Sequence, residues 1–379
     1  MSRLLLVALL LLLVVVLAVV ASDLVRFVTS STRAAAVNPG SGATTPLALR
    51  QAGASSQPLS VAAIERRVDP GLVDINVTFG NAAAGAATGM VLTPSGVVLT
   101  NNHVIAGATR ITARDIGDGR TYRASVVGYA RTRDVAIIQL AGASDLRTVP
   151  LGDSQTVTVG DRVVALGNAG GVGGRPSAAR GRVTALDQTI TASDMGGGNA
   201  QRLTRLIQTN APIRPGDSGG PLVDARGRVI GMDAAASAAF AAHPAATEGY
   251  AIPIDRALAL ARQIERGASS TIVHVGPTGF LGVQLVPAGQ VGGGIGGTPG
   301  SRFRGALIAG VLPGYPAEAA GLAEGDVVTS IDGRPVDSAN ALTGVLSTRH
   351  PGDVVRIAWV DRQGRAHQAA VTLASGPPQ

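Results

Sequence analysis

Short runs that alternate apolar and polar residues follow one another between residues 61 and 253. Gly, Pro, Asn and Asp stand between the runs, and the alternation places successive side chains on opposite faces of a strand. Many short strands separated by turn residues predict a mainly β domain, built as two small barrels. The runs are GLVDINVTF, GMVLTPSGVVLTNN, RITARD, RASVVGY, DVAIIQL, RVVALGN, RGRVTALDQTI, RLIQTNA, PLVDARGRVIGMDA and GYAIPID.

A helical pattern replaces this alternation in PIDRALALARQIERG, which begins at Pro253. Leu258, Ala261 and Ile264 recur at helical spacing, and Gly267 ends the pattern. We expect this helix to close a β domain that spans residues 61–267.

A second unit is expected at residues 279–375, after a linker at residues 268–278. Here FLGVQLV and GALIAGVL have the composition of strands, and PAEAAGL and DSANALTGVLST that of short helices. GDVVTSIDG is typical of a strand and turn, and DVVRIAWVDRQGRAHQAAVTL of a hairpin. The mixture predicts a small α+β domain.

The N-terminus carries an uncharged apolar segment at residues 4–21, LLLVALLLLLVVVLAVVA. As a helix it would be about 27 Å long, enough to cross a bilayer. Small residues at its end offer a cleavage site, so both a signal peptide and a membrane anchor stay open. Either one places the rest of the chain outside the cytoplasm, secreted or anchored through residues 4–21. Residues 22–60, rich in Ser, Thr, Ala, Pro and Gly, predict a flexible linker.

Composition narrows the classes of function. The chain has no cysteine, which excludes disulfides, thiolate metal sites and cysteine nucleophiles. Its net charge of +7 comes from scattered arginines, and only 3% of the residues are aromatic. Without basic runs or aromatic stacking residues, nucleic acid is not an expected partner. The histidines other than His103 lack ligand-like spacing to one another, so we expect no metal and no other cofactor; they are His243, His274, His350 and His367.

The string RPGDSGGPLV places Ser218 between Asp217 and two glycines. A serine becomes nucleophilic only when a base takes its proton. His103 in VVLTNNHVIAGA is the only histidine of the β domain that precedes Ser218, and Asp134 opens the apolar run DVAIIQL. A carboxylate at the start of a buried strand needs a hydrogen-bond donor, which a histidine N–H would supply.

Each of these strings alone has an ordinary structural interpretation. GDSGG is typical of a surface hairpin, a lone histidine is usually structural, and an aspartate before a strand often forms a turn. Together they occur in the order His, Asp, Ser, which is the order of the chymotrypsin-like arrangement.

On these strings the chain resembles the HtrA group of trypsin-fold serine proteases, which carry a C-terminal PDZ domain. The likeness extends over about residues 65–375 and is strongest to secreted members from mycobacteria and other actinobacteria. It rests on TGMVLTPSGVVLTNNHVIAGA, RDVAIIQL, VVALGNAGG, LIQTNAPIRPGDSGGPLV, VIGMDAAAS, GYAIPID, FLGVQL and LPGYPAEAAGLAEGDVVTSIDGRPV. It implies a chymotrypsin-like double β-barrel followed by an α+β PDZ domain, behind an N-terminal apolar export or anchor helix.

The resemblance also implies roles for residues of the first domain. His103 would act as general base and then general acid, Asp134 would orient it, and Ser218 would form an acyl-enzyme. The N–H groups of Gly216 and Ser218 would form the oxyanion hole. An uncharged S1 pocket predicts aliphatic P1 residues, with substrate bound by Ala211, Pro212, Met232, Asp233, Ala234 and Ala235.

Three positions depart from the family pattern. Asp217 stands where HtrA members usually have Asn, Asn210 replaces the usual Asp, and LGNAGG lacks the usual Pro-Phe. These departures leave the resting shape of the oxyanion loop open, between an active and a latent state. The chain lacks the insert that builds large cage-like oligomers in some relatives, because the corresponding segment, residues 81–88, is short. Assembly as a homotrimer stays open.

In the second domain the resemblance assigns a carboxylate-binding loop to Leu281, Gly282 and Val283, beside which a C-terminal peptide would add as a strand. The leading hypothesis is therefore an exported serine endopeptidase that cleaves unfolded, misfolded or specific envelope proteins in protein quality control. A second hypothesis is a latent protease that acts as a peptide-binding, chaperone-like protein. A third is a scaffold in which only the PDZ domain acts.

Overall fold

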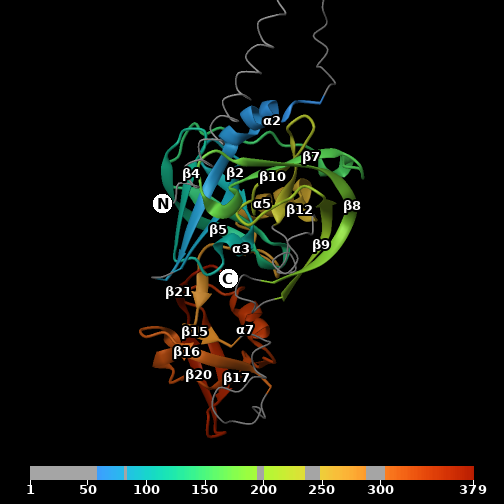
Figure 1. The fold of residues 1–379 in the computed structure, drawn as a ribbon. Coiled ribbons are helices and arrows are strands. Elements are labelled where there is room, and N and C mark those ends of the chain that lie inside the picture. Colours follow the sequence, from blue (N-terminus) through green and yellow to red (C-terminus); the bar gives the residue numbers. More distant parts are fainter. Residues whose placement is uncertain (1–57, 81–82, 194–199, 235–247, 287–303) are drawn as a thin grey trace, which may run out of the picture. The chain divides into compact units, whose positions relative to one another are not determined.

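The computed structural model describes residues 58–379 except 81–82, 194–199, 235–247 and 287–303 (Figure 1). The apolar segment 4–21 and nearly all of the expected linker lie outside the described residues. Residues 57–379 form one compact unit. Within the described ranges, no helix is both long enough and apolar enough to pass through a bilayer.

The described chain opens with a helix that the alternation did not predict, α2 (Val61–Val68). The Ser60 hydroxyl caps it by accepting a hydrogen bond from the Ala63 N–H, and Ile64 and Val68 are buried. Two turns are too short to show a helical period clearly, so sequence reasoning placed strands from residue 61 onward. A 3-10 turn, η1 (Asp69–Gly71), leads from it into the first strand.

The first barrel is a sheet that closes because β5 pairs with both β4 and β6. Its strands follow in the order β5-β4-β1-β2-β3-β6, with β13 (His274–Val275) added beside β5. Ile75 and Ile138 are among the side chains that fill its interior. The strands are β1 (Leu72–Phe79), β2 (Ala83–Val91), β3 (Val97–Thr100), β4 (Arg110–Asp115), β5 (Thr121–Ala130) and β6 (Val135–Leu140).

The second barrel closes in the order β10-β11-β12-β9-β8-β7. Leu222 and Ile230 lie in its own core. Its strands are β7 (Arg162–Gly167), β8 (Ser177–Ser193), β9 (Ala200–Thr209), β10 (Pro221–Asp224), β11 (Val229–Ala234) and β12 (Gly249–Pro253). The prediction of two small barrels is confirmed.

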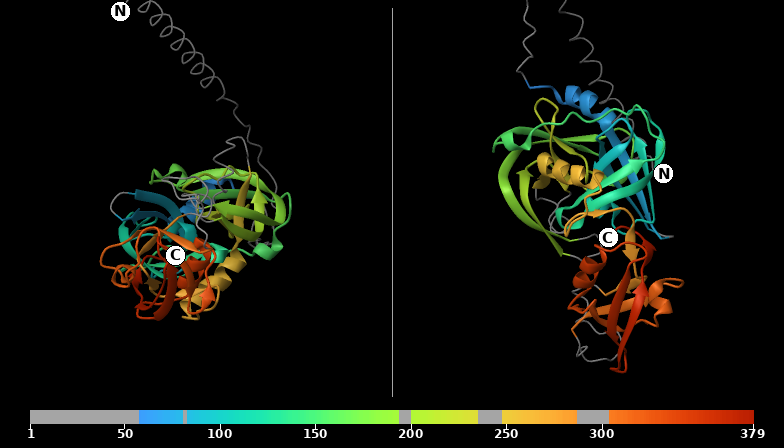
Figure 2. Two further views of the ribbon diagram at one scale, coloured as in Figure 1. Left: turned by 90° about the horizontal axis from the view of Figure 1, so that it is seen from below. Right: turned by 180° about the vertical axis from the view of Figure 1, so that it is seen from behind.

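The predicted helix is present as α5 (Ile254–Glu265) and contacts strands of both barrels (Figure 2). Its buried face carries Leu258, Ala261 and Ile264, the three positions that set its helical spacing in the sequence. These side chains belong to a cluster that also contains Leu99 of the first barrel and Met232 of the second. The apolar contact between the barrels thus fixes how the two halves of the candidate site face each other.

The C-terminal domain is α+β, as the sequence predicted. Its sheet runs β15-β16-β17-β19-β20 with β18 beside β17, and β14 pairs with β21. Trp359 and Leu342 lie in its core, and the tail is tied down as β21 where only a tail was expected. The elements are β14 (Thr278–Phe280), β15 (Val283–Leu285), β16 (Ala306–Val311), α6 (Pro316–Ala319), β17 (Val327–Ile331), β18 (Arg334–Pro335), α7 (Ala339–Leu346), β19 (Val354–Val360), β20 (Ala366–Thr372) and β21 (Ala374–Gly376).

Candidate active site

The first barrel brings His103 and Asp134 together through the pairing of β3 with β6. Thr100, the last residue of β3, stands opposite Ala136 near the start of β6. His103 follows in the short helix α3 (Asn102–Ile105), and Asp134 ends the 3-10 turn η2 (Arg131–Arg133) just before β6. Asp134 has a left-handed backbone, with φ 54° and ψ 44°, a conformation that Asp tolerates better than most residues.

The Asp134 carboxylate accepts hydrogen bonds from both the ring and the backbone of His103. Its Oδ2 and Oδ1 lie 2.9 and 3.0 Å from His103 Nδ1, and Oδ1 accepts from the His103 backbone N–H at 2.9 Å. The Asp134 side chain is 4% exposed and that of His103 34%. An ionised carboxylate can only accept, so Nδ1 carries the proton and Nε2 is the ring nitrogen suited to take another. This geometry can orient a general base.

The loop that carries Ser218 packs against the end of the strand that leads to His103. The Thr88 N–H donates to the Ser218 carbonyl at 2.9 Å, and the Gly219 N–H donates to the Asp233 carbonyl at 2.9 Å. A Cβ atom on Gly219 would collide with Thr100 Oγ1 and with the Thr88 carbonyl. The close approach that the glycine permits therefore sets the serine loop beside the segment that carries His103.

Two backbone N–H groups of this loop point opposite to peptide carbonyls that are held by hydrogen bonds. The Pro215 carbonyl accepts from the Gly170 N–H at 2.7 Å, and the Asp217 carbonyl accepts from the Gly220 N–H at 2.8 Å. No peptide bond is cis, and in a trans peptide the N–H points opposite to the C=O. The N–H groups of Gly216 and Ser218 belong to these two peptides, and among the described residues neither has a hydrogen-bond partner. Two neighbouring free donors are what stabilisation of an oxyanion requires.

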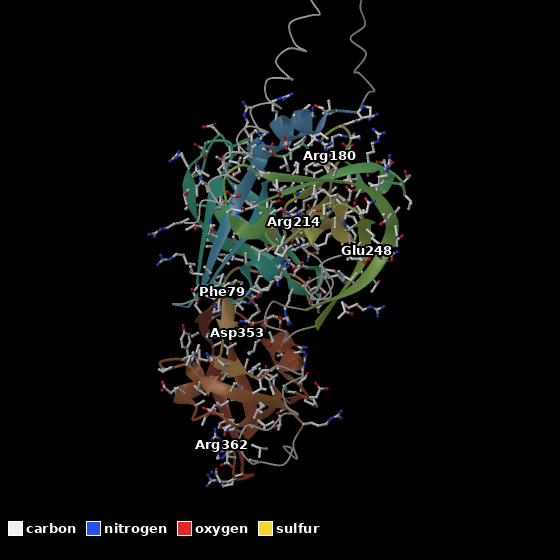
Figure 3. The ribbon with its side chains drawn as sticks, viewed as in Figure 1. Phe79, Arg180, Arg214, Glu248, Asp353 and Arg362 are labelled. Carbon is white, nitrogen blue, oxygen red and sulfur yellow. The ribbon has the colours of Figure 1, made fainter. Side chains whose placement is uncertain are left out.

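Two carboxyl groups close to Ser218 are buried: Asp217 precedes it in the loop, and Asp233 lies in β11, beside that loop. Asp217 Oδ2 accepts from the Arg214 backbone N–H at 2.8 Å, and its Oδ1 lies 3.5 Å from Ser177 Oγ. Burial raises the pKa of Asp217, against the lowering effect of these hydrogen bonds. Figure 3 draws the described side chains and labels Arg214 at the start of the loop. The closest donor to the Asp217 carboxyl is thus the backbone N–H of Arg214.

Asp233 is fully buried, and neither of its carboxylate oxygens has a partner among the described residues. Burial first, and then the nearby Asp217, raise its pKa well above the ordinary value. Asp233 was expected to bind substrate, and its burial was not foreseen. Its backbone pairs with the Gly219–Gly220 segment on one side and with β12 on the other. The edge of β11 that faces the serine loop is therefore occupied as far as Asp233.

The other predicted substrate-binding residues differ in accessibility. Ala211 and Met232 are fully buried and Ala234 is nearly so, whereas Pro212 is exposed. Ala235 lies outside the described residues. The assignment of these residues to substrate stays a prediction.

In the C-terminal domain, the three residues of the predicted carboxylate-binding loop stand at the start of β15. Leu281 is buried, Gly282 has φ 85°, and Val283 begins the strand. The Tyr315 side chain packs so closely on Gly282 that a Cβ atom would collide with it. β15 is the end strand of its sheet.

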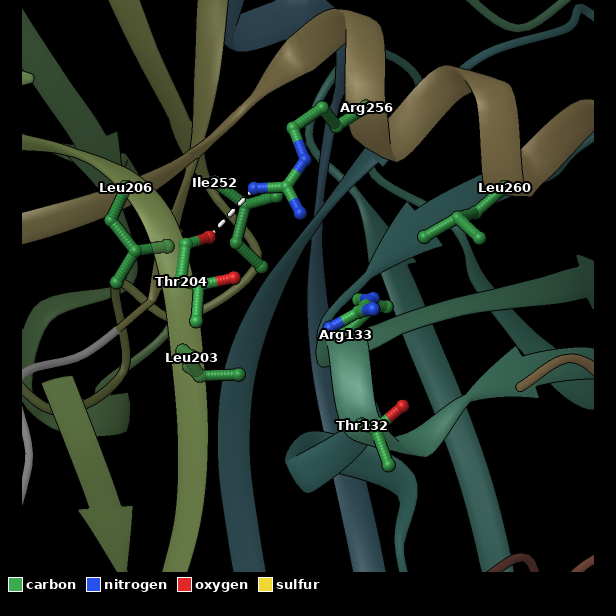
Figure 4. Close-up of a pocket in the computed structure, with 8 residues that line it drawn as sticks. All are labelled: Thr132, Arg133, Leu203, Thr204, Leu206, Ile252, Arg256 and Leu260. Atoms are coloured by element: carbon green, nitrogen blue, oxygen red, sulfur yellow. Dashed lines mark hydrogen bonds between the residues drawn. The ribbon is translucent and has the colours of Figure 1, made fainter. Parts of the chain in front are cut away.

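A cavity lies between β9, α5 and η2 (Figure 4). Arg256 reaches from α5 and donates to the Thr204 carbonyl at 2.6 Å. None of the predicted site residues lines it; its walls are Thr132, Arg133, Leu203, Thr204, Leu206, Ile252, Arg256 and Leu260. In the described part of the chain, no group of three or more His, Asp or Glu side chains is placed to hold a metal ion.

Sequence reasoning missed Thr88, whose hydroxyl contacts the serine loop. It lies in β2 inside the string TGMVL, which carried the family likeness but suggested no role for this side chain. A threonine in a buried strand is ordinary, so no local signal distinguishes it. The contact joins residues 128 positions apart and becomes visible only in three dimensions.

Comparisons with known proteins agree with this geometry. Residues 87–232 match the trypsin-like peptidase domain family, and residues 279–373 match the PDZ domain family. A Synechocystis sp. protein named serine protease HhoA is 34% identical over 312 residues, which are 75% of this chain and 72% of that protein. Serine protease PepD of Mycobacterium tuberculosis is 32% identical over 334 residues, 84% of this chain and 67% of that protein. The periplasmic pH-dependent serine endoprotease DegQ of Escherichia coli is 32% identical over 303 residues, 76% of this chain and 59% of that protein.

Proposed function

The chain belongs to the HtrA family of serine proteases, with a trypsin-like peptidase domain and a PDZ domain, and from this premise we propose that it is an exported endopeptidase acting through His103, Asp134 and Ser218. One observation supports the proposal most directly. A histidine held by a buried carboxylate lies beside a serine loop in which two adjacent N–H groups, those of Gly216 and Ser218, lack partners among the described residues. This combination supplies a base, a nucleophile and an oxyanion site.

In the proposed reaction, Ser218 Oγ attacks the substrate carbonyl while its proton passes to His103 Nε2. The oxyanion accepts hydrogen bonds from the N–H groups of Gly216 and Ser218. Asp134 stays ionised and stabilises the imidazolium. The imidazolium then protonates the leaving amine, which breaks the C–N bond and leaves an acyl-enzyme. Water deprotonated by His103 hydrolyses the ester and regenerates the serine.

The proposed substrates are extended segments of unfolded or misfolded polypeptides. Because β11 is paired as far as Asp233, a substrate strand would add at Ala234, the last described residue of the strand. Pro212 carries no charge where trypsin-like pockets hold an acid, and Ala211 and Ala234 are small, which favours aliphatic P1 residues. A peptide library that was cut only after Lys or Arg would contradict this specificity.

We assign peptide binding to the PDZ domain through the free edge of β15, where a C-terminal peptide would add as a strand. Its carboxylate would bind at Leu281, Gly282 and Val283. An extracytoplasmic location is supported by the apolar N-terminal segment and by the relative DegQ, whose name places it in the periplasm. A latent, chaperone-like role has less support, because the N–H groups of Gly216 and Ser218 lack partners among the described residues.

The test compares casein degradation by the full-length protein with that by its Ser218→Ala variant. Loss of the nucleophile should reduce kcat by about 10⁶-fold, so cleavage should vanish. A fluorophosphonate probe should label only the protein that has Ser218. Circular dichroism controls for folding of both proteins. Folded wild-type protein that neither cleaves nor reacts with the probe would overturn the proposal, and so would cleavage that survives in the variant.

A further inference from the structure

We propose that Thr88 is a positioning residue, whose hydroxyl holds the Ser218 loop in the shape that presents the oxyanion donors. The inference rests on the proposed function and adds a residue to its machinery. Thr88 belongs to the first barrel, in β2, whereas Gly216 and Ser218 belong to the second. The side chain is therefore placed to join the two halves of the site.

Four hydrogen bonds converge on this residue, which is 1% exposed. Its backbone N–H donates to the Ser218 carbonyl at 2.9 Å, and its carbonyl accepts from Thr100 Oγ1 at 2.8 Å. Its Oγ1 donates to the Gly216 carbonyl at 2.8 Å and accepts from the Asn168 N–H at 2.9 Å. Thr88 thus contacts both residues that supply an oxyanion donor.

The direction of these bonds is fixed by the chemistry of the partners. The Asn168 N–H can only donate, so Oγ1 accepts from it and directs its single proton to the Gly216 carbonyl. Gly170, two residues after Asn168, donates to the Pro215 carbonyl at 2.7 Å. The hydroxyl therefore holds the Gly216 carbonyl directly and the Pro215 carbonyl through the Asn168–Gly170 turn.

Removing the hydroxyl would leave the Asn168 N–H and the Gly216 carbonyl without these partners. Unpaired polar groups in a buried site are unfavourable, so the loop would rotate to pair them elsewhere. Gly216 and Gly170 have φ of 99° and 77°, and a glycine can leave such a conformation easily. Rotation of the Pro215–Gly216 peptide would take the Gly216 N–H out of the oxyanion site. Loss of one such donor lowers kcat by about 10²- to 10³-fold.

The experiment measures kcat and KM of the full-length protein on a fluorogenic peptide with an aliphatic P1 residue. Thr88→Val keeps the shape of the side chain but removes the hydroxyl, and its kcat should fall about 10²-fold with little change in KM. Thr88→Ser keeps the hydroxyl and should retain most of the activity. Thr88→Cys replaces the hydroxyl with a thiol, which is a weak donor, and its kcat should lie between those of the Val and Ser variants.

Thr278→Val is the matched control. Thr278 is 2% exposed, and its Oγ1 shares a 3.0 Å hydrogen bond with the Tyr129 hydroxyl. The control therefore loses a buried threonine hydrogen bond away from residues 214–220 and away from the residues assigned to substrate. It should be destabilised while its kcat stays near that of the wild type.

Wild-type activity that persists unchanged in Thr88→Val would overturn the role of Thr88 and leave the proposed function intact. An equal fall of kcat in Thr278→Val, or failure of Thr88→Ser to restore kcat, would also overturn it. If Thr88→Val does not fold, the comparison of Cys with Ser decides, and equal kcat in these two variants contradicts the proposal. Absence of activity in the wild type would instead contradict the proposed function itself.

Discussion

The two halves of the candidate site bury acidic side chains at similar depth but surround them with different numbers of hydrogen-bond donors. On the first-barrel side, the single carboxylate of Asp134 accepts from the ring and from the backbone of His103. On the second-barrel side, Asp217 has one close donor, and Asp233 has none among the described residues. The three carboxyls therefore share burial and differ in the hydrogen-bond donors around them.

The difference follows from how the two halves are held. The first half is fixed by hydrogen bonds between the Asp134 carboxylate and both the ring and the backbone N–H of His103. The second half is fixed by backbone hydrogen bonds and by glycines that approach other chain segments closely. Its buried carboxyls have raised pKa values because burial outweighs the few donors they have. We expect chemistry to depend on charge in the first half and on backbone shape in the second.

The largest expected effect comes from changing the charge in the first half. In Asp134→Asn the amide can present an N–H to His103 Nδ1, which favours the tautomer that cannot act as base at Nε2. We expect kcat to fall by about 10⁴-fold while the fold is kept. The measurement is peptide hydrolysis near neutral pH, with circular dichroism as the control. A variant that keeps a tenth of the wild-type kcat would show that Asp134 does not orient the base.

A smaller effect is expected from changing backbone shape in the second half. Gly216 has φ 99°, and a Cβ atom there would collide with the Asn168 carbonyl, so Gly216→Ala must displace the loop. With one oxyanion donor misplaced, kcat should fall by about 10²- to 10³-fold.

Gly160→Ala is the matched control for this substitution. Gly160 has φ 97° but nothing within 4 Å of an added Cβ. It should lose stability from the unfavourable backbone conformation and keep its kcat. Equal losses of kcat in both variants would mean that strain in general, and not the position of the Gly216 N–H, limits activity.

The fold was predictable because its signals are local. Alternation and turn residues indicated the barrels, and Leu258, Ala261 and Ile264 indicated α5, the helix that contacts both. The helix α2 was not predicted, because two helical turns show little periodicity in the sequence. The sequence also indicated His103, Asp134 and Ser218, because nucleophilic catalysis restricts which residue types can serve. Their order along the chain is that of the chymotrypsin-like arrangement.

The supporting contacts of the site were not predictable in the same way. Thr88 acts across 128 residues of sequence, and the lack of partners for Asp233 depends on what surrounds β11. The local sequence around Thr88 and around Asp233 does not distinguish either one from an ordinary strand residue. The question that Asp217 raised about the oxyanion loop likewise needed coordinates, because the donor to its carboxyl is a backbone N–H, that of Arg214.

The smallest expected effect is that of Asp217→Asn, which removes a charge from the second half while keeping its shape. The Asn oxygen can still accept from the Arg214 N–H, so kcat should stay near that of the wild type.

The difference in free energy of unfolding between this variant and the wild type should change with pH. Because the folded pKa of Asp217 is raised, the folded protein binds this proton more tightly than the unfolded chain does. The free energy of unfolding of the wild type therefore falls as pH rises from about 4 through the folded pKa.

The Asp217→Asn variant has no carboxyl group at this position, so its free energy of unfolding does not fall in this way. The substitution also removes the charge that helps to raise the pKa of Asp233. Its free energy of unfolding should match that of the wild type near pH 4 and exceed it at pH 7, as measured by urea denaturation across that range. Other buried carboxyls contribute to both proteins, so the difference between the two curves is the quantity that tests the argument. A difference that does not grow with pH would mean that the donors around Asp217 compensate its charge as fully as those around Asp134. The contrast between the two halves would then disappear. A large loss of kcat in the same variant would show instead that charge, and not backbone shape alone, controls the serine loop.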